Sequence, residues 1–213
     1  MLSTRQNAVM AETVHVAIYD TLADWEVGAA IAHINDPQWQ KRPGRYRVQT
    51  VALTADPIVT MGGMRIVPDT TLDQVAPSES AMLILPGATA WDTSDMLTPF
   101  AKKARELLDA DVPVAAICGA TGGLAKEGLL DDRDHTSGAA VYLDSLGYGG
   151  AARYKDVPAV TDRNVITAGP PSPFEFAREI FAALDMYSPE VLAAWYQLFG
   201  QNDPAGYYVL ASA

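Results

Sequence analysis

The sequence predicts an α/β protein with a doubly wound, mostly parallel sheet that helices cover on both faces. Short apolar runs of strand length alternate along the chain with segments of helical periodicity. Two of these runs, Ala81 to Leu85 and Val114 to Ile117, are entirely apolar, which is typical of strands buried on both faces of a parallel sheet. One clear hairpin signal occurs, at Asp162-Arg163-Asn164. In such a sheet, ligands bind beyond the carboxyl ends of the strands.

The first part of the chain is expected to hold three strands and a helix. The strands are separated by turn residues, and the helix carries apolar residues at helical spacing. The expected elements are a strand over His15 to Tyr19, a helix over Trp25 to Ile34, a loop over Asn35 to Gly44, a strand over Tyr46 to Leu53, and a short strand or hairpin over Met64 to Val67.

The second part is expected to alternate helices with the remaining strands. Ser94 or Asp95 can cap a helix whose apolar face holds Met96, Phe100, Ala104, Leu107 and Leu108. The hairpin signal lies between strands over Ala159 to Thr161 and Val165 to Ala168, and helices over Phe174 to Leu184 and Pro189 to Phe199 follow.

The 213 residues suit one domain, because they contain no repeat, low-complexity tract or charge block that would mark a linker. We expect a core of about 13–186 and a helical extension over 187–213.

Charge and composition predict a cytoplasmic protein that binds a small molecule. The net charge of −11 repels nucleic acid and anionic membrane surfaces, and no apolar run is long enough to cross a bilayer. Residues Met1 to Glu12 lack the continuous apolar segment of a secretory signal. A single cysteine cannot form an internal disulfide, which fits a reducing compartment.

That cysteine, Cys118, stands where a buried strand ends and a helix of small residues begins. This is the layout of a nucleophile elbow, whose strained turn requires small side chains two positions to either side, here Ala116 and Ala120. The helix start favours the thiolate and so lowers the thiol pKa. The alternative is an inert buried cysteine, which is common in proteins.

Several residues are candidates for a proton-transfer partner of the thiol. Glu26 follows Trp25 directly after the first strand, where burial would raise its pKa, and Asp20 and Asp24 have a similar reach. Each carboxylate could instead only cap a helix. His135 could return to the top of the sheet as a base, or be a polar loop residue.

The turn Pro86-Gly87-Ala88 ends a buried strand and can present N–H groups. Gly87 and Ala88, together with the N–H of Gly119, could form an oxyanion hole. A plain strand-ending turn is the equal alternative.

Taken together, five segments resemble the DJ-1/PfpI superfamily, with its class I glutamine amidotransferase-like, flavodoxin-like sandwich. They are Ala-Asp-Trp-Glu after the first strand, Leu-Ile-Leu-Pro-Gly, Ala-Ala-Ile-Cys-Gly, Arg-Asp-His-Thr, and Val-Ile-Thr-Ala-Gly-Pro followed by Phe-Glu-Phe-Ala. The resemblance runs from about His15 to Leu184. It implies that Cys118 is the nucleophile, Glu26 the acid that hydrogen-bonds it, and His135 the histidine that approaches it.

Two departures narrow the activity. Gly119 stands where PfpI-type proteases carry a histidine, and the Cys-X-Gly-X-Gln elbow and late His-X-Glu of glutamine amidotransferases are absent. The resemblance then implies a homodimeric cysteine enzyme, a hydrolase or lyase without cofactor or metal, that acts on a small carbonyl or amide-like substrate. The alternative is a redox-responsive or chaperone-like stress protein that senses oxidation at Cys118.

Overall fold

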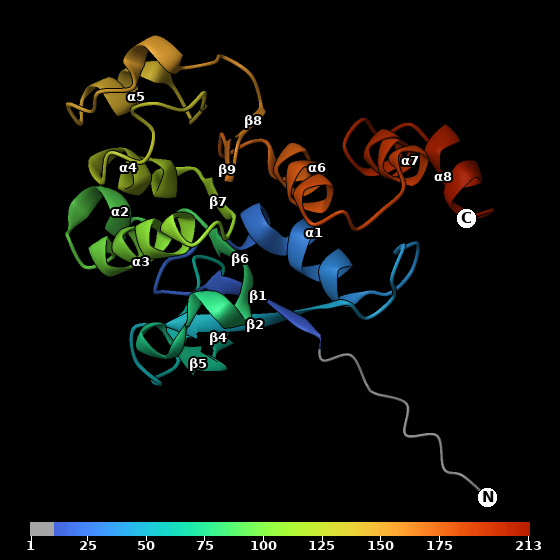
Figure 1. The fold of residues 1–213 in the computed structure, drawn as a ribbon, viewed down its shortest axis with the longest axis horizontal. Coiled ribbons are helices and arrows are strands. Elements are labelled where there is room, and N and C mark those ends of the chain that lie inside the picture. The colour runs from blue at the N-terminus through green and yellow to red at the C-terminus, as the bar shows by residue number, and fades with distance from the viewer. Residues whose placement is uncertain (1–10) are drawn as a thin grey trace, which may run out of the picture.

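The computed structural model describes residues 11–213, and a seven-stranded sheet lies at its centre (Figure 1). The strand order is β5-β2-β1-β6-β7-β9-β8, and all neighbours are parallel except β8 and β9. The predicted fold class is confirmed. The prediction that Met1 to Glu12 form no secretory signal concerns residues that lie largely outside the described part. The strands are β1 (Glu12–Ala17), β2 (Tyr46–Ala52), β5 (Thr70–Thr71), β6 (Ser80–Leu85), β7 (Val114–Ile117), β8 (Ala159–Asp162) and β9 (Val165–Ala168).

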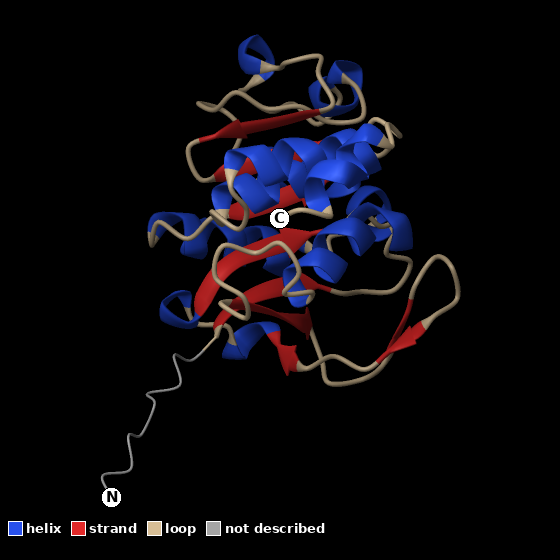
Figure 2. Ribbon diagram, turned by 90° about the vertical axis from the view of Figure 1, so that its right-hand side faces the viewer, coloured by secondary structure: helices blue, strands red, loops and turns tan. Residues whose placement is uncertain are grey.

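Helices cover both faces of the sheet, as Figures 1 and 2 show. One face carries α2 (Ala90–Thr93), α3 (Thr98–Asp109), α4 (Gly119–Lys126) and α5 (Ala140–Asp144). The other carries α1 (Asp24–Asn35), α6 (Pro173–Ala183), α7 (Pro189–Phe199) and α8 (Ala205–Leu210). None of these helices is long and apolar enough to cross a bilayer.

The all-apolar strands are explained by these two layers. In β6, Leu83 and Leu85 pack into the core on the α3 side, whereas Met82 and Ile84 pack into the core on the α1 side. Because successive side chains in a strand point to opposite faces, a strand with helices on both sides needs apolar residues at every position.

Two features differ from the expectation for the middle of the chain. Helix α3 begins at Thr98 rather than near Ser94 or Asp95, and Met96 lies outside it with 62% of its surface exposed. Pro99 explains the later start, because its fixed φ and missing N–H suit the first turn of a helix. Of the short strand or hairpin expected over Met64 to Val67, the structure has the hairpin, but it begins earlier, as the antiparallel pair β3 (Ile58–Val59) and β4 (Arg65–Ile66).

The last two helices belong to the same core as the helices of their face. Trp195 of α7 is fully buried, and its ring lies 4.9 Å from that of Phe181 in α6 and 5.3 Å from that of His33 in α1. Ser188 caps α7 by accepting a bond from the Val191 N–H. The aromatic residues of this segment therefore cover α1 and α6.

The sheet order places three loops side by side at the carboxyl edge. Strand β6 lies between β1 and β7, so the segment after β1 and the segment after β7 meet across the turn that follows β6. These segments carry Glu26, Cys118 and Gly87 respectively.

Candidate functional site

Cys118 occupies a strained turn between β7 and α4. Its φ of 60° and ψ of −131° lie in a region that residues with side chains rarely adopt. The surroundings hold the turn in place, because the Cys118 N–H donates to the Ala168 carbonyl and its own carbonyl accepts from the Thr121 hydroxyl at 2.6 Å. Ala116 and Ala120 are fully buried, as the elbow requires. The sulfur is therefore held at the carboxyl edge of the sheet on a partly exposed residue.

Three glycines in α4 allow large side chains to lie directly against the elbow helix. A Cβ at Gly123 would lie 2.3 Å from the Trp91 ring, and one at Gly122 would lie 2.3 Å from the Tyr142 hydroxyl oxygen. A Cβ at Gly119 would lie 3.2 Å from Trp91 Cβ. Glycine costs helix stability, so its use here indicates close packing rather than helix propensity.

Glu26, near the start of α1, is completely buried. Its Oε2 accepts the Gly87 N–H at 2.6 Å. Its Oε1 is buried and lacks a hydrogen-bond partner of standard geometry within residues 11–213. Burial raises the pKa of this carboxyl, and the Gly87 N–H and the Cys118 thiol oppose that shift. An ionised carboxylate would here be a poorly solvated anion.

Gly87 is the point at which Glu26 and Cys118 meet. A Cβ at this position would lie 2.7 Å from Cys118 Cβ, 2.8 Å from Glu26 Oε2 and 2.9 Å from Cys118 Sγ. All three distances are shorter than real Cβ contacts. Gly87 therefore leaves the space in which the acid and the thiol face each other, although their strands are not neighbours.

Burial disfavours the charged form of both groups, and each also affects the pKa of the other. Burial, followed by the charge of Glu26 and its hydrogen bond, raises the pKa of the Cys118 thiol to about 12, and the Gly119 N–H lowers it less. The lowered thiol pKa expected from the start of α4 is thus outweighed, first of all by burial. A thiolate forms only when the proton moves to Glu26, because two adjacent buried anions repel each other.

The other two carboxylates considered for this role point elsewhere. Asp20 Oδ1 accepts the Val59 N–H at 2.8 Å, and Asp24 Oδ2 accepts the Gly62 N–H at 2.6 Å. Both therefore hold the β3–β4 pair against the segment that follows β1.

Of the three residues expected to form an oxyanion hole, Gly87 has another role. The Gly87 N–H donates to Glu26 and so does not serve an oxyanion. Ala88 forms an isolated antiparallel bridge with Leu22, and its carbonyl accepts the Trp91 N–H. The Gly119 N–H acts on the sulfur itself. Gly119 thus remains next to the thiol, and the Ala88 carbonyl oxygen lies 3.5 Å from a Cβ built at Gly119.

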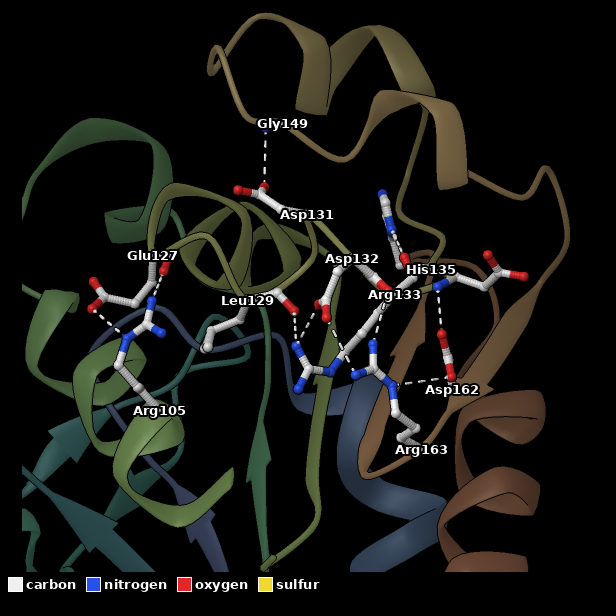
Figure 3. Close-up of polar contacts among 11 residues, drawn as sticks. Arg105, Glu127, Leu129, Asp131, Asp132, Arg133, His135, Gly149, Asp162 and Arg163 are labelled. Carbon is white, nitrogen blue, oxygen red and sulfur yellow. Dashed lines mark hydrogen bonds and ion pairs between the residues drawn. The ribbon is translucent and has the colours of Figure 1, made fainter. Parts of the chain in front are cut away.

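His135 is fully buried, but the structure does not bring its ring nitrogens to the thiol. Nδ1 is 2.8 Å from the Arg133 carbonyl oxygen (Figure 3), and Nε2 is 2.9 Å from the Tyr148 hydroxyl. Neighbouring bonds from Arg163 to Asp132 fix this loop. Both nitrogens of His135 therefore have structural partners.

Two side chains at the mouth of the site were not anticipated from the sequence. The Tyr142 hydroxyl donates to Asp92 Oδ1 at 2.7 Å and lies 3.4 Å from the Gly119 carbonyl oxygen. The glycines of α4 were the available signal, because Gly122 and Gly123 make room for Tyr142 and Trp91. Within residues 11–213, no three or more His, Cys, Asp or Glu side chains group to hold a metal ion.

Two known bacterial proteins are similar to this chain over most of its length. A protein from Bacillus subtilis named "Uncharacterized protease YoaZ" is 37% identical over 200 residues, which are 92% of this chain and 95% of that protein. A second protein of that bacterium, "Uncharacterized protease YdeA", is 34% identical over 81% of this chain and 83% of its own length.

Solved structures show the same fold. A thiJ/pfpI family protein from Bacillus anthracis has a TM-score of 0.88 and 36% identity, covering 95% of this chain and 96% of its own. The DJ-1 superfamily protein Atu0886 from Agrobacterium tumefaciens has a TM-score of 0.77 and 29% identity, covering 89% of this chain and 98% of its own. The model of the DJ-1/PfpI family matches residues 12–183. The chain therefore belongs to the DJ-1/PfpI family.

Proposed function

We propose that the protein is a cofactor-independent cysteine enzyme that acts on a small carbonyl or amide-like substrate. The observation that carries the proposal is the meeting of a strained cysteine and a buried acid at Gly87. Burial of an acid without further donors is costly, and it persists where the acid has a chemical task.

The chemistry begins with the proton that Cys118 and Glu26 share. As the sulfur adds to the carbonyl carbon, Glu26 takes the thiol proton, an S–C bond forms, and the carbonyl π electrons move to oxygen. Glu26 then returns the proton to that oxygen. With a 2-oxoaldehyde, Glu26 can next move the proton from C1 to C2 through an enediol, and water cleaves the resulting thioester to a 2-hydroxy acid. The thiol is thereby regenerated.

Two N–H groups are proposed to stabilise the developing oxyanion. Gly119 follows the nucleophile and Ala88 lies beside Gly119, whereas Gly87 is excluded because its N–H holds Glu26. A tetrahedral intermediate from an amide substrate would place its oxygen in the same position.

His135 has no chemical step in this proposal. Its nitrogens are engaged by the Arg133 carbonyl and the Tyr148 hydroxyl, so we assign it to holding the loop after α4. This departs from the role that the family resemblance implies.

We further propose a cytoplasmic homodimer. Trp25, Met61 and Met64 expose 52%, 52% and 56% of their surfaces, and the Gly62 N–H bond to Asp24 ties the turn between β3 and β4 to the start of α1. An apolar patch of this kind suits a second copy of the chain. Sedimentation at low micromolar concentration should give a dimer mass, and a monomer would contradict this assignment.

Turnover of methylglyoxal tests the proposed activity. The reduced protein is incubated with methylglyoxal and lactate is measured, in parallel with the variant Cys118→Ser. Lactate formation that the variant loses supports the enzyme. Slow loss of one thiol per chain after peroxide, with no product from aldehyde or amide substrates, would instead support the redox-responsive alternative.

A further inference from the structure

Asp92 and Tyr142 form a polar rim at the mouth of the Cys118 site. Asp92 belongs to α2 and Tyr142 to α5, and the 2.7 Å bond from the tyrosine hydroxyl to Oδ1 joins the two helices. The same hydroxyl lies 3.4 Å from the carbonyl oxygen of Gly119, the residue that follows the nucleophile. The hydroxyl has a single proton, and the shorter contact to the carboxylate takes it.

The position of this rim is fixed from both sides. Trp91, which precedes Asp92, is buried and donates from Nε1 to the Tyr19 hydroxyl and to the Pro86 carbonyl, each at 3.0 Å. Gly122 leaves space for the Tyr142 hydroxyl, which would lie 2.3 Å from a Cβ there. Asp92 is exposed, but its bond from Tyr142 and its place next to the buried Trp91 fix where the carboxylate lies.

No side-chain cation neutralises the carboxylate. Asp92 takes part in no ion pair within residues 11–213. The nearby ammonium of Lys126 donates to the Trp91 carbonyl at 3.3 Å. The charge of Asp92 reaches the nucleophile, since it contributes to the raised pKa of Cys118, although it is the smallest of the contributions named. Glu26 adds a second acid behind the sulfur.

We propose that Asp92, held by Tyr142, is a specificity-determining residue that makes the site favour neutral or amine-bearing electrophiles over those with a carboxylate or phosphate near the reacting carbon. The inference rests on the proposed function, because it names which carbonyl or amide compounds reach Cys118. A fixed negative charge close to the nucleophile lowers the local concentration of anions and raises that of cations. Neutral 2-oxoaldehydes would enter, whereas 2-oxoacids would be disfavoured.

Alkylation of the thiol tests this without any turnover. The chain has one cysteine, so its rates with iodoacetamide, which is neutral, and iodoacetate, which is anionic, report on Cys118 alone. The ratio of the two rates cancels any change in the thiol pKa, and N-acetylcysteine gives the reference ratio. We expect the protein to disfavour iodoacetate about three- to tenfold more than the reference does, and added salt to reduce that difference.

Three variants assign the effect. Asp92→Asn keeps an acceptor for Tyr142 and should move the ratio toward the reference. Tyr142→Phe keeps the charge but frees the carboxylate, and should change the ratio less. Asp109→Asn removes an exposed charge at the end of α3, just before β7 begins, and should leave the ratio unchanged.

An unchanged ratio in Asp92→Asn, or a wild-type ratio equal to the reference, would overturn the inference. The alkylation test is independent of the proposed function, because it measures the reactivity of the thiol and not enzymatic turnover. If methylglyoxal is not turned over and the Asp92→Asn ratio still shifts, the proposed function fails while the charge effect at the rim stands. If methylglyoxal is turned over, Asp92→Asn should also raise the kcat/KM for a 2-oxoaldehyde that carries a carboxylate, relative to that for methylglyoxal.

Discussion

Glu26 and His135 are both completely buried, and the family resemblance gives both a role beside Cys118, but their hydrogen bonding differs. His135 has a partner at each ring nitrogen, the Arg133 carbonyl and the Tyr148 hydroxyl. Glu26 has one donor, the Gly87 N–H, and a second oxygen without a hydrogen-bond partner of standard geometry within residues 11–213. Burial of a polar side chain therefore does not by itself identify a chemical role.

The difference lies in what each residue leaves available. A fully bonded imidazole stabilises its loop and has no lone pair or proton to give away. A carboxyl with an unused oxygen next to a thiol can take and return a proton. We therefore expect substitutions at Glu26 to affect turnover and substitutions at His135 to affect stability.

The largest expected effect is that of Glu26→Gln on turnover. The amide can still accept the Gly87 N–H but cannot carry the shared proton, so kcat for methylglyoxal should fall about 10²- to 10⁴-fold. Glu26→Asp shortens the side chain and should also lower kcat. Wild-type turnover in both variants would show that Glu26 is only a carboxylate in the first turn of α1.

Gly87→Ala should lower turnover about 10²-fold. The added Cβ cannot fit at 2.7 Å from Cys118 Cβ and 2.8 Å from Glu26 Oε2, so one of the two groups must move, and small displacements of reacting groups are costly. Gly28→Ala in α1 is the matched control, because nothing lies within 4 Å of a Cβ there. Equal turnover in the two variants would contradict the role of Gly87.

His135→Phe should leave kcat within about threefold of wild type but lower the free energy of unfolding by about 1–3 kcal/mol. The substitution leaves the Tyr148 hydroxyl and the Arg133 carbonyl without their partner, and an unpaired polar group that stays buried is destabilising. Urea unfolding and lactate formation are measured on the same preparation. A large loss of kcat with unchanged stability would restore His135 to the chemistry.

The sequence predicts the edge of the sheet better than the contacts at that edge. All-apolar runs identify β6 and β7, and strand alternation with helices gives the fold class, so Glu26, Gly87 and Cys118 could be expected near one another. The hydrogen-bond partner of the Gly87 N–H depends on the orientation of the Glu26 carboxyl group. No local sequence pattern predicts that orientation. The surroundings of His135 likewise come from Tyr148, which packs against it from a later loop.

Local signals also competed with one another along the chain. Ser94 and Asp95 are good caps, but Pro99 belongs in a first turn, and the later start it favours leaves Met96 exposed. The glycines of α4 oppose helix formation, and such glycines in a helix can indicate that large side chains pack against it. Here those side chains are Trp91 and Tyr142.

The smallest expected effect is a pH-dependent difference in stability between wild type and Glu26→Gln. Burial raises the pKa of Glu26 above its usual value of 4.5, so between the two values the native state holds a proton that the unfolded state has released. Stability then falls as pH rises, because ∂ΔG/∂pH follows the protons bound by the unfolded state minus those bound by the native state. The contribution is present below pH 4.5 and is lost as pH rises through the native pKa.

Gln at position 26 binds no such proton, so the stability of Glu26→Gln relative to wild type should increase as pH rises from 4.5 through the native pKa of Glu26 and then level off. Glu190→Gln, an exposed carboxyl at the start of α7, controls for the loss of one negative charge. Urea unfolding at several pH values gives the difference at each. A difference that stays constant, or that matches Glu190→Gln, would mean that the native and unfolded states hold this proton equally, and burial would then not raise the pKa of Glu26.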